Sequence, residues 1–160
     1  MRHVTAILSV AAVVLMTGGV VAQAKPSFAG EWKKVTEQGQ GEPGVDLTIT
    51  QTATVMTVEY RAGSQTPAAG KLTYKLDGSA SRNLMAGRGG AAPTEQVSKA
   101  MWAANTLVVT TTTGAGAEKR AFSMEGDALV VDTSAPMRAG GTPTVTRVKY
   151  QRYERGHGGE

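Results

Sequence analysis

Short segments rich in strand-forming residues alternate with turn-forming segments along nearly the whole chain after residue 28. Thr and Val, which favour strands, are abundant within the former segments, and Gly and Pro gather between them. No stretch has a convincing helical period. The expected strands are residues 30–36, 45–51, 54–61, 71–76, 80–85, 96–103, 106–113, 118–124, 128–134 and 144–153. This pattern predicts an all-β protein.

Several of these segments separate an apolar face from a polar one. In residues 71–76, for example, Leu72, Tyr74 and Leu76 alternate with polar residues. Strict alternation is typical of an antiparallel sheet with one side against a core and the other against solvent.

The connections between the expected strands alternate in length. The tight ones are Thr52-Ala53, Asp77-Gly78-Ser79, Ala104-Asn105 and Glu125-Gly126-Asp127, and the long ones are residues 37–44, 62–70, 86–95 and 135–143. In a meander, alternate connections lie at opposite ends of the strands. The lengths therefore predict an antiparallel up-and-down meander barrel of 8–10 strands, with one end closed by tight turns and one ringed by long loops. Closure removes the exposed edges that a large open sheet would keep. A two-sheet sandwich is the alternative.

The N-terminus has the organisation of a secretory signal. A short basic start precedes a mostly apolar run over residues 4–16, and Ala22-Gln23-Ala24 places small residues where a signal peptidase requires them. A membrane anchor is the alternative, but this run is shorter than the roughly 20 residues that span a bilayer. We expect residues 1–24 to be a cleaved signal peptide. The mature protein would then be exported, to the periplasm or the extracellular space.

The remaining chain is expected to form one domain over residues 25–153, followed by a flexible tail over residues 154–160. Its composition excludes several kinds of site. Without Cys it has no disulfide, thiol nucleophile or thiolate metal site. The two His of the full sequence both lie outside the expected domain, His3 in the signal and His157 in the tail. The formal net charge of +4 is too small to indicate a nucleic-acid binder. We therefore expect no metal, no cofactor and no nucleic-acid partner.

Residues near the two ends of the expected domain should meet at the closed end of the barrel. Gly30-Glu31-Trp32 opens the first strand, and Arg152 ends the last one. Closure would place Trp32 and Arg152 on adjacent strands at the closed end, where the guanidinium can stack on the indole. This arrangement resembles the lipocalins, whose first strand carries Gly-x-Trp with an Arg packed across the Trp, and Val35 also fits their pattern. The lipocalin Thr-Asp-Tyr motif and disulfide are absent.

The whole mature chain is also similar to lipocalin-like (calycin-type) exported bacterial β-barrel proteins of unassigned function. The shared features are the Gly-x-Trp start, a Tyr-x-x-Asp-Gly turn at Tyr74 and a Trp-x-x-x-x-Leu-Val-Val hairpin at Trp102. The resemblance implies a closed end built on Gly30, Trp32 and Arg152.

Arg120 is the most informative charged residue. It alternates in phase with Phe122 and Met124 and follows the connection at residues 114–117, so it should point into the barrel at the open mouth. An inward Arg there could bind an anionic head group. The alternative is a side chain that reaches past the rim to water. The candidate ligand-binding residues are Arg120, Tyr60, Phe122, Arg61, Arg88 and Arg138.

These features favour a protein that binds a small apolar or amphipathic ligand at its mouth and performs no chemistry on it. The alternative is a barrel filled by its own side chains, which serves as a structural or protein-interaction module of the cell envelope, including an inhibitor-type role. An enzyme is the third possibility, because no nucleophile and general base stand out in the sequence. The space inside the barrel decides between the first two.

Overall fold

The computed structural model describes residues 24–35, 46–60, 70–85, 92–113, 116–135 and 144–154. These residues form ten strands: β1 (Gly30–Lys34), β2 (Leu47–Gln51), β3 (Val55–Tyr60), β4 (Lys71–Lys75), β5 (Ala80–Met85), β6 (Thr94–Ala103), β7 (Thr106–Thr113), β8 (Gly116–Glu125), β9 (Ala128–Ala135) and β10 (Thr144–Arg152). The all-β prediction is confirmed, and the strands differ from the expected ranges only at their ends. No described residue belongs to a helix that is long and apolar enough to cross a membrane.

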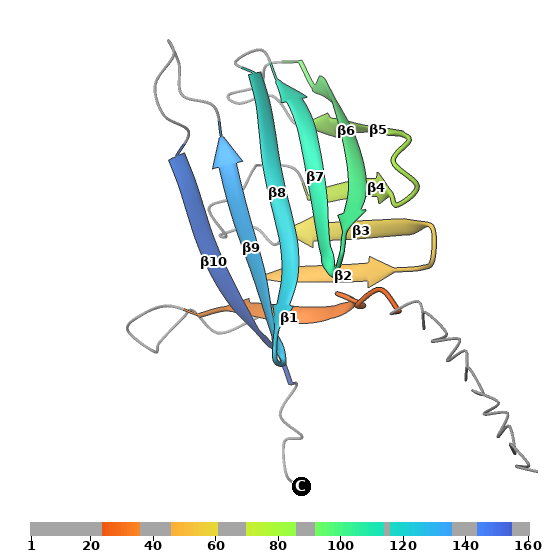
Figure 1. Cartoon of the computed structure of the whole chain (residues 1–160). Coiled ribbons are helices and arrows are strands. Elements are labelled where there is room, and N and C mark those ends of the chain that lie inside the picture. The colour runs from red at the N-terminus through yellow and green to blue at the C-terminus, as the bar shows by residue number, and fades with distance from the viewer. Residues whose placement is uncertain are drawn as a thin grey trace, which may run out of the picture.

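The ten strands form one antiparallel sheet in the order β4-β3-β2-β1-β10-β9-β8-β7-β6-β5. Pairing of the first strand with the last curls this sheet into a nearly closed barrel, so the predicted meander barrel is confirmed and two separate sheets are not formed. The barrel is flattened, because β2 and β3 on one wall run crosswise to β7 and β9 on the other (Figure 1). Two walls that cross in this way enclose one core between their inner faces.

Antiparallel order fixes which strand ends share a rim. The strand ends Lys34, Tyr60, Met85 and Ala135, which lead into the long connections, lie on one rim, called here the mouth. The tight turns lie on the opposite rim, called here the base. Most residues of the four long connections fall outside the described part of the chain.

The barrel has a seam between β4 and β5, which stand at the two ends of the strand order. The tight turn expected at Asp77-Gly78 forms, but no backbone ladder joins these two strands. Instead, the Asn83 amide accepts a hydrogen bond from the Thr73 N–H (2.7 Å) and donates one to the Thr73 carbonyl (3.1 Å). The Ser81 hydroxyl accepts one from the Lys75 N–H (2.8 Å). Side chains of β5 therefore take the place of a backbone partner for β4.

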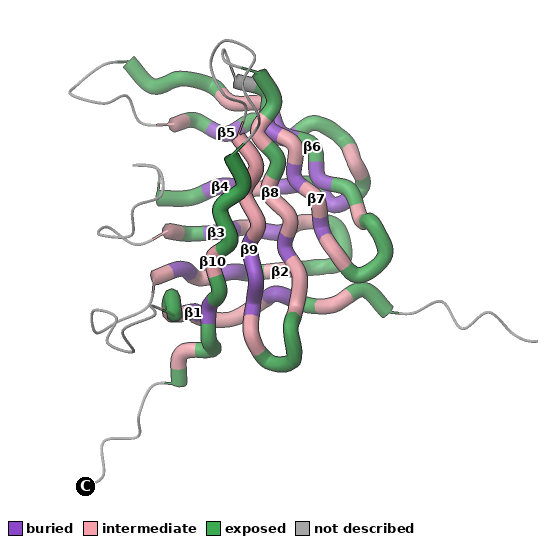
Figure 2. The backbone as a smooth tube through the Cα atoms, turned by 60° about the vertical axis from the view of Figure 1, so that its left-hand side comes forward, coloured by how far each residue is buried: buried purple, intermediate pink, exposed green. Residues whose placement is uncertain are grey.

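The core lies between the two walls and continues to the base. Its largest fully buried side chains include Trp32 from β1, Met56 from β3, Leu107 from β7 and Phe122 from β8. Phe28, which precedes β1, belongs to the same cluster. Purple buried positions alternate with exposed green or intermediate pink ones along several strands, β4 and β5 among them (Figure 2), as the sequence alternation predicts.

The seam generates the first prediction. Asn83→Ala should lower the free energy of unfolding by about 1–3 kcal/mol, because it leaves partly buried backbone groups of Thr73 without their side-chain partner. Urea unfolding measures the change. Arg82→Ala is the matched control on the same strand, since its exposed ion pair with Glu95 is worth about 0–1 kcal/mol. Equal stabilities of the two variants would contradict a structural role for the Asn83 amide.

Candidate functional site

The base is built around Trp32 and Arg152. These residues are direct cross-strand partners in the β1–β10 ladder, and the guanidinium carbon lies 4.7 Å from the centroid of the indole. Trp32 is fully buried, whereas Arg152 is exposed and donates a hydrogen bond to the Ala29 carbonyl (3.2 Å). The structure thus brings together the two residues that the sequence places at the closed end. Val35, which fits the lipocalin pattern, is 39% exposed and does not join the core.

Gly30 is favoured at its position by its backbone conformation and by the same contact. A Cβ atom at residue 30 would lie 2.5 Å from the terminal nitrogen Nη1 of Arg152, and the φ angle of +149° is one that L-residues rarely adopt. The Gly-x-Trp spacing therefore has a physical reason: Trp32 offers the ring face, and Gly30 leaves room for the cation that covers it.

Residues 25–29, which precede β1, cover the base of the barrel. The Gln51 amide accepts a hydrogen bond from the Phe28 N–H (2.9 Å) and donates one to the Pro26 carbonyl (3.1 Å). Trp32 Nε1 donates to the Phe28 carbonyl (2.9 Å). The Phe28 ring stacks on Trp102, with 5.7 Å between centroids. Sequence analysis missed this segment, although an apolar residue directly before the first strand was a signal for it.

Phe122 packs at the base, against the segment at residues 25–29, and not at the mouth. Its ring lies 6.2 Å from that of Phe28, and its side chain is fully buried. Phe122 shares the inner face with Arg120, but two residues along a strand amount to about 6–7 Å. That spacing carries it below the polar region, so its expected place in the entrance is not what the structure shows.

Arg120 points into the barrel near the mouth, as its alternation predicts. Its Nε atom lies 2.8 Å from a carboxylate oxygen of Glu118, and Nη1 donates a hydrogen bond to the Tyr60 hydroxyl (3.3 Å). Tyr60 stands on β3, so this bond links the two walls. The side chains of Arg120 and Glu118 are 13% and 25% exposed, which leaves both within reach of solvent.

The inner face of β6–β8 changes from polar to apolar between mouth and base. Nearest the mouth, the strand register aligns Ser98, Thr111 and Glu118, and the two hydroxyls lie 2.8 Å apart. The next row is mixed, and the row after it is apolar. The mixed row is Ala100, Val109 and Arg120, and the apolar row is Trp102, Leu107 and Phe122. The inner face of these three strands thus becomes more apolar from the mouth toward the base.

Tyrosine hydroxyls complete the polar region. Burial raises the pKa of Tyr60, and the neighbouring Arg120 opposes that shift. Burial also raises the pKa of Tyr74 and of Tyr150 above the ordinary value of 10.0. The burial of Arg120 acts to lower its own pKa, but Tyr60, Tyr74 and Glu118 outweigh that effect and the net shift is upward. The guanidinium therefore stays charged, and the three phenols stay neutral, at every pH near 7.

The other predicted mouth residues are not placed by the structure. Arg61, Arg88 and Arg138 lie outside the described residues. Asp46, at the start of β2, was not singled out by sequence analysis, but its charge acts on Tyr150. Within the described ranges there is no group of three or more His, Cys, Asp or Glu side chains that could hold a metal ion.

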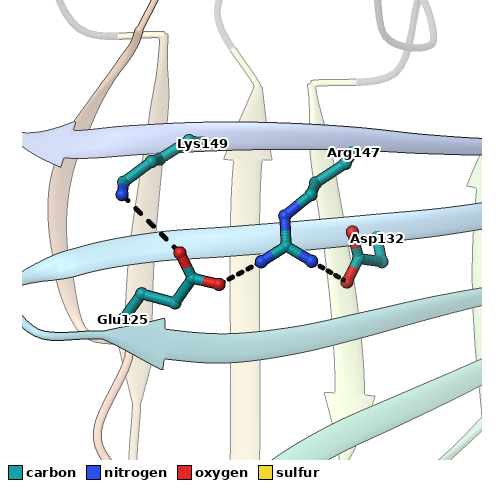
Figure 3. A network of polar contacts seen from close by, with 4 residues as sticks. All are labelled: Glu125, Asp132, Arg147 and Lys149. Atoms are coloured by element: carbon teal, nitrogen blue, oxygen red, sulfur yellow. Dashed lines mark hydrogen bonds and ion pairs between the residues drawn. The ribbon is translucent and has the colours of Figure 1, made fainter.

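A second charged cluster lies on the outer face of β8–β10. Arg147 bridges Glu125 and Asp132, and Lys149 pairs with the other oxygen of Glu125 (Figure 3). Val130, a cross-strand partner of Lys149, shares this outer face and is nonetheless fully buried. The side chains of these exposed ion pairs lie on the same face as the buried Val130. We therefore assign the ion pairs a structural role on this face. They also supply surface controls for charge changes at the mouth.

A comparison with models of known protein families finds no match to this chain, and no curated protein is significantly similar to it. Function is accordingly inferred from the residues of the base and the mouth.

The base generates a second prediction. Trp32→Ala should cost about 3–5 kcal/mol of stability, as truncation of a buried aromatic does, and Arg152→Ala should cost less. Because the two groups touch, the costs should not add in the double variant. Urea unfolding of the four proteins gives the coupling. The pair Trp32→Ala and Arg147→Ala is the additive control, and additivity in the Trp32–Arg152 cycle would show that the stacking contributes nothing.

The buried phenols generate a third prediction. Below pH 10 they are protonated in both the folded and the unfolded chain, so they cause no dependence of stability on pH. Above pH 10 only the unfolded chain releases these protons readily, and stability should fall as pH rises. Tyr74→Phe and Tyr150→Phe should each reduce the slope. Urea unfolding between pH 8 and about 11 measures it, and unchanged slopes in both variants would contradict the upward shifts.

Proposed function

We propose that this protein is an exported lipocalin-like barrel that binds a small amphipathic ligand at its mouth. One observation carries the proposal: a charged Arg120 lies inside the barrel, within reach of solvent, above an interior that becomes apolar toward the base. Polar groups that converge at the opening of an otherwise apolar interior are a common arrangement in ligand sites.

The energetic cost of this arrangement supports a functional role. A guanidinium inside a barrel loses much of its hydration. Glu118 and Tyr60 offset that loss, but they are themselves polar groups that lose hydration in the interior. A Leu or Val at residue 120 would fill the same inner position of β8 at a lower cost. A costly polar cluster beside an opening is therefore a candidate site on physical grounds.

Binding without chemistry is the form of the proposal that the contacts favour. Glu118 is paired with a cation, and Arg120 donates to both of its partners, so neither is arranged as a general base beside a nucleophile. The tyrosines are held neutral by burial. These groups can orient a ligand, and we propose no reaction for them.

Export is part of the proposal and is supported by the signal-like N-terminus. The contacts of the base begin directly after the predicted cleavage site, because Lys25 Nζ donates to the Ala104 carbonyl (3.0 Å) and lies 5.7 Å from the Trp102 ring centroid. A chain that starts at Lys25 would keep every contact that closes the base.

A filled barrel is the second candidate function. One cluster of buried side chains joins both walls, and Phe28 adds to it from outside the sheet. A barrel whose interior is occupied in this way would act through its surface, as a structural or interaction module of the envelope.

A blocking experiment separates the two candidates. The probe is N-phenyl-1-naphthylamine, an uncharged aromatic amine that fluoresces in apolar sites. Thr133→Trp places a large side chain on the inner face of β9, directly beside Arg120. Thr146→Trp places one on the same face of β10, beside Thr133, at a position that is exposed to solvent. Ligand binding predicts saturable fluorescence in the wild type and at least about a tenfold weaker affinity in both variants.

Thr110→Trp is the matched control, because Thr110 pairs with the outward Lys119 on the opposite face of the sheet. It should bind the probe as the wild type does, and urea midpoints verify that all variants are folded. Absence of saturable binding to the wild type, or equal binding by all four proteins, would favour the filled barrel. Native mass spectrometry of protein purified from its own host would then show whether any small molecule accompanies it.

A further inference from the structure

The charge of Arg120 is already balanced inside the barrel. Its Nε atom and a carboxylate oxygen of Glu118 are 2.8 Å apart, and both side chains project from β8 toward the interior, two residues apart. The pair is only partly exposed, so water screens it less than it screens a surface pair. The site therefore presents a cation and an anion side by side, and not an isolated positive charge.

A simple anion is poorly matched to this site. To reach Arg120 it would have to lie close to Glu118, and two like charges at that separation repel. A simple cation meets the converse problem, since the carboxylate that would attract it is held against the Arg120 guanidinium.

A ligand that carries both charges avoids both problems. Its anionic group would accept hydrogen bonds from Arg120 and from Tyr60, whose hydroxyl oxygen accepts from Arg120 and whose proton can be donated onward. Its ammonium group would face Glu118, so that each charge of the pair gains a partner when the original contact is loosened.

We propose that the mouth recognises a zwitterionic head group, in which an ammonium and an anionic group are separated by a short spacer. The inference rests on the proposed function, because it names the ligand class of that same site. It also refines the expectation of an anionic head group, which considered Arg120 without Glu118.

Three amphiphiles with the same number of carbon atoms, ten, test the charge preference: decanoate, decylammonium and 2-aminodecanoate. Each is titrated, below its micelle concentration, against the wild-type protein loaded with N-phenyl-1-naphthylamine. We expect 2-aminodecanoate to displace the probe at a concentration about tenfold lower than either of the others, because only this ligand gives both Arg120 and Glu118 a charged partner.

Two charge variants reverse the preference in opposite directions. Glu118→Gln leaves Arg120 uncompensated, and decanoate should become the strongest competitor. Arg120→Gln leaves Glu118 uncompensated, and decylammonium should become the strongest. The matched controls are Glu125→Gln and Arg147→Gln in the outer-face network, which remove the same charges and should keep the wild-type order.

The outcomes distinguish this inference from the function on which it rests. If the probe binds the wild type and decanoate or decylammonium displaces it best, the zwitterion is excluded while ligand binding stands. If the probe does not bind, or no amphiphile displaces it, the proposed function itself fails. Should either charge variant not fold, as urea unfolding reports, the order of the three competitors on the wild type decides alone.

Discussion

The pairing of β1 with β10 is the contact on which the rest of the structure depends. It joins the two most distant strands of the chain, and the register Trp32↔Arg152 puts the cation over the indole at the base. Without this ladder, both strands would be free edges, and the inner face of the sheet would be exposed to water. Gly30 and the segment at residues 25–29 act on the same place, the first by leaving room for Arg152 and the second by covering Trp32.

The second closure works by a different means. At the seam between β4 and β5, Ser81 and Asn83 satisfy the backbone of β4 with side chains in place of a ladder. The barrel is therefore held by a short backbone ladder at one junction and by a few buried polar side chains at the other. A junction of the second kind needs only small local changes to open, which makes it the weaker of the two.

The polarity of the interior connects this architecture to function. The base is sealed by Trp32, Phe28 and Phe122, whereas the polar residues of the inner face of β6–β8, Ser98, Thr111 and Arg120, lie nearer the mouth. There the two walls meet through the bond between Arg120 and Tyr60. The mouth is thus the one region of the described interior where charge, hydrogen-bonding groups and access to solvent coincide, and this coincidence gives the site its chemical character.

Local pattern determined the strands, their alternation and the alternating turn lengths, because residue type and periodicity act over a few neighbours. The up-and-down strand order then predicted that Trp32 and Arg152 lie at the same end, and side-chain alternation predicted that Arg120 points inward. Only the tertiary structure decided that Glu118 and Tyr60 meet Arg120, that Phe122 belongs to the base, and that Asn83 closes the seam. Apart from the pair Glu118–Arg120, which lies within β8, these contacts join opposite walls, cross the seam or come from the segment before β1. They depend on the curl and flattening of the whole sheet, which no short stretch of sequence encodes.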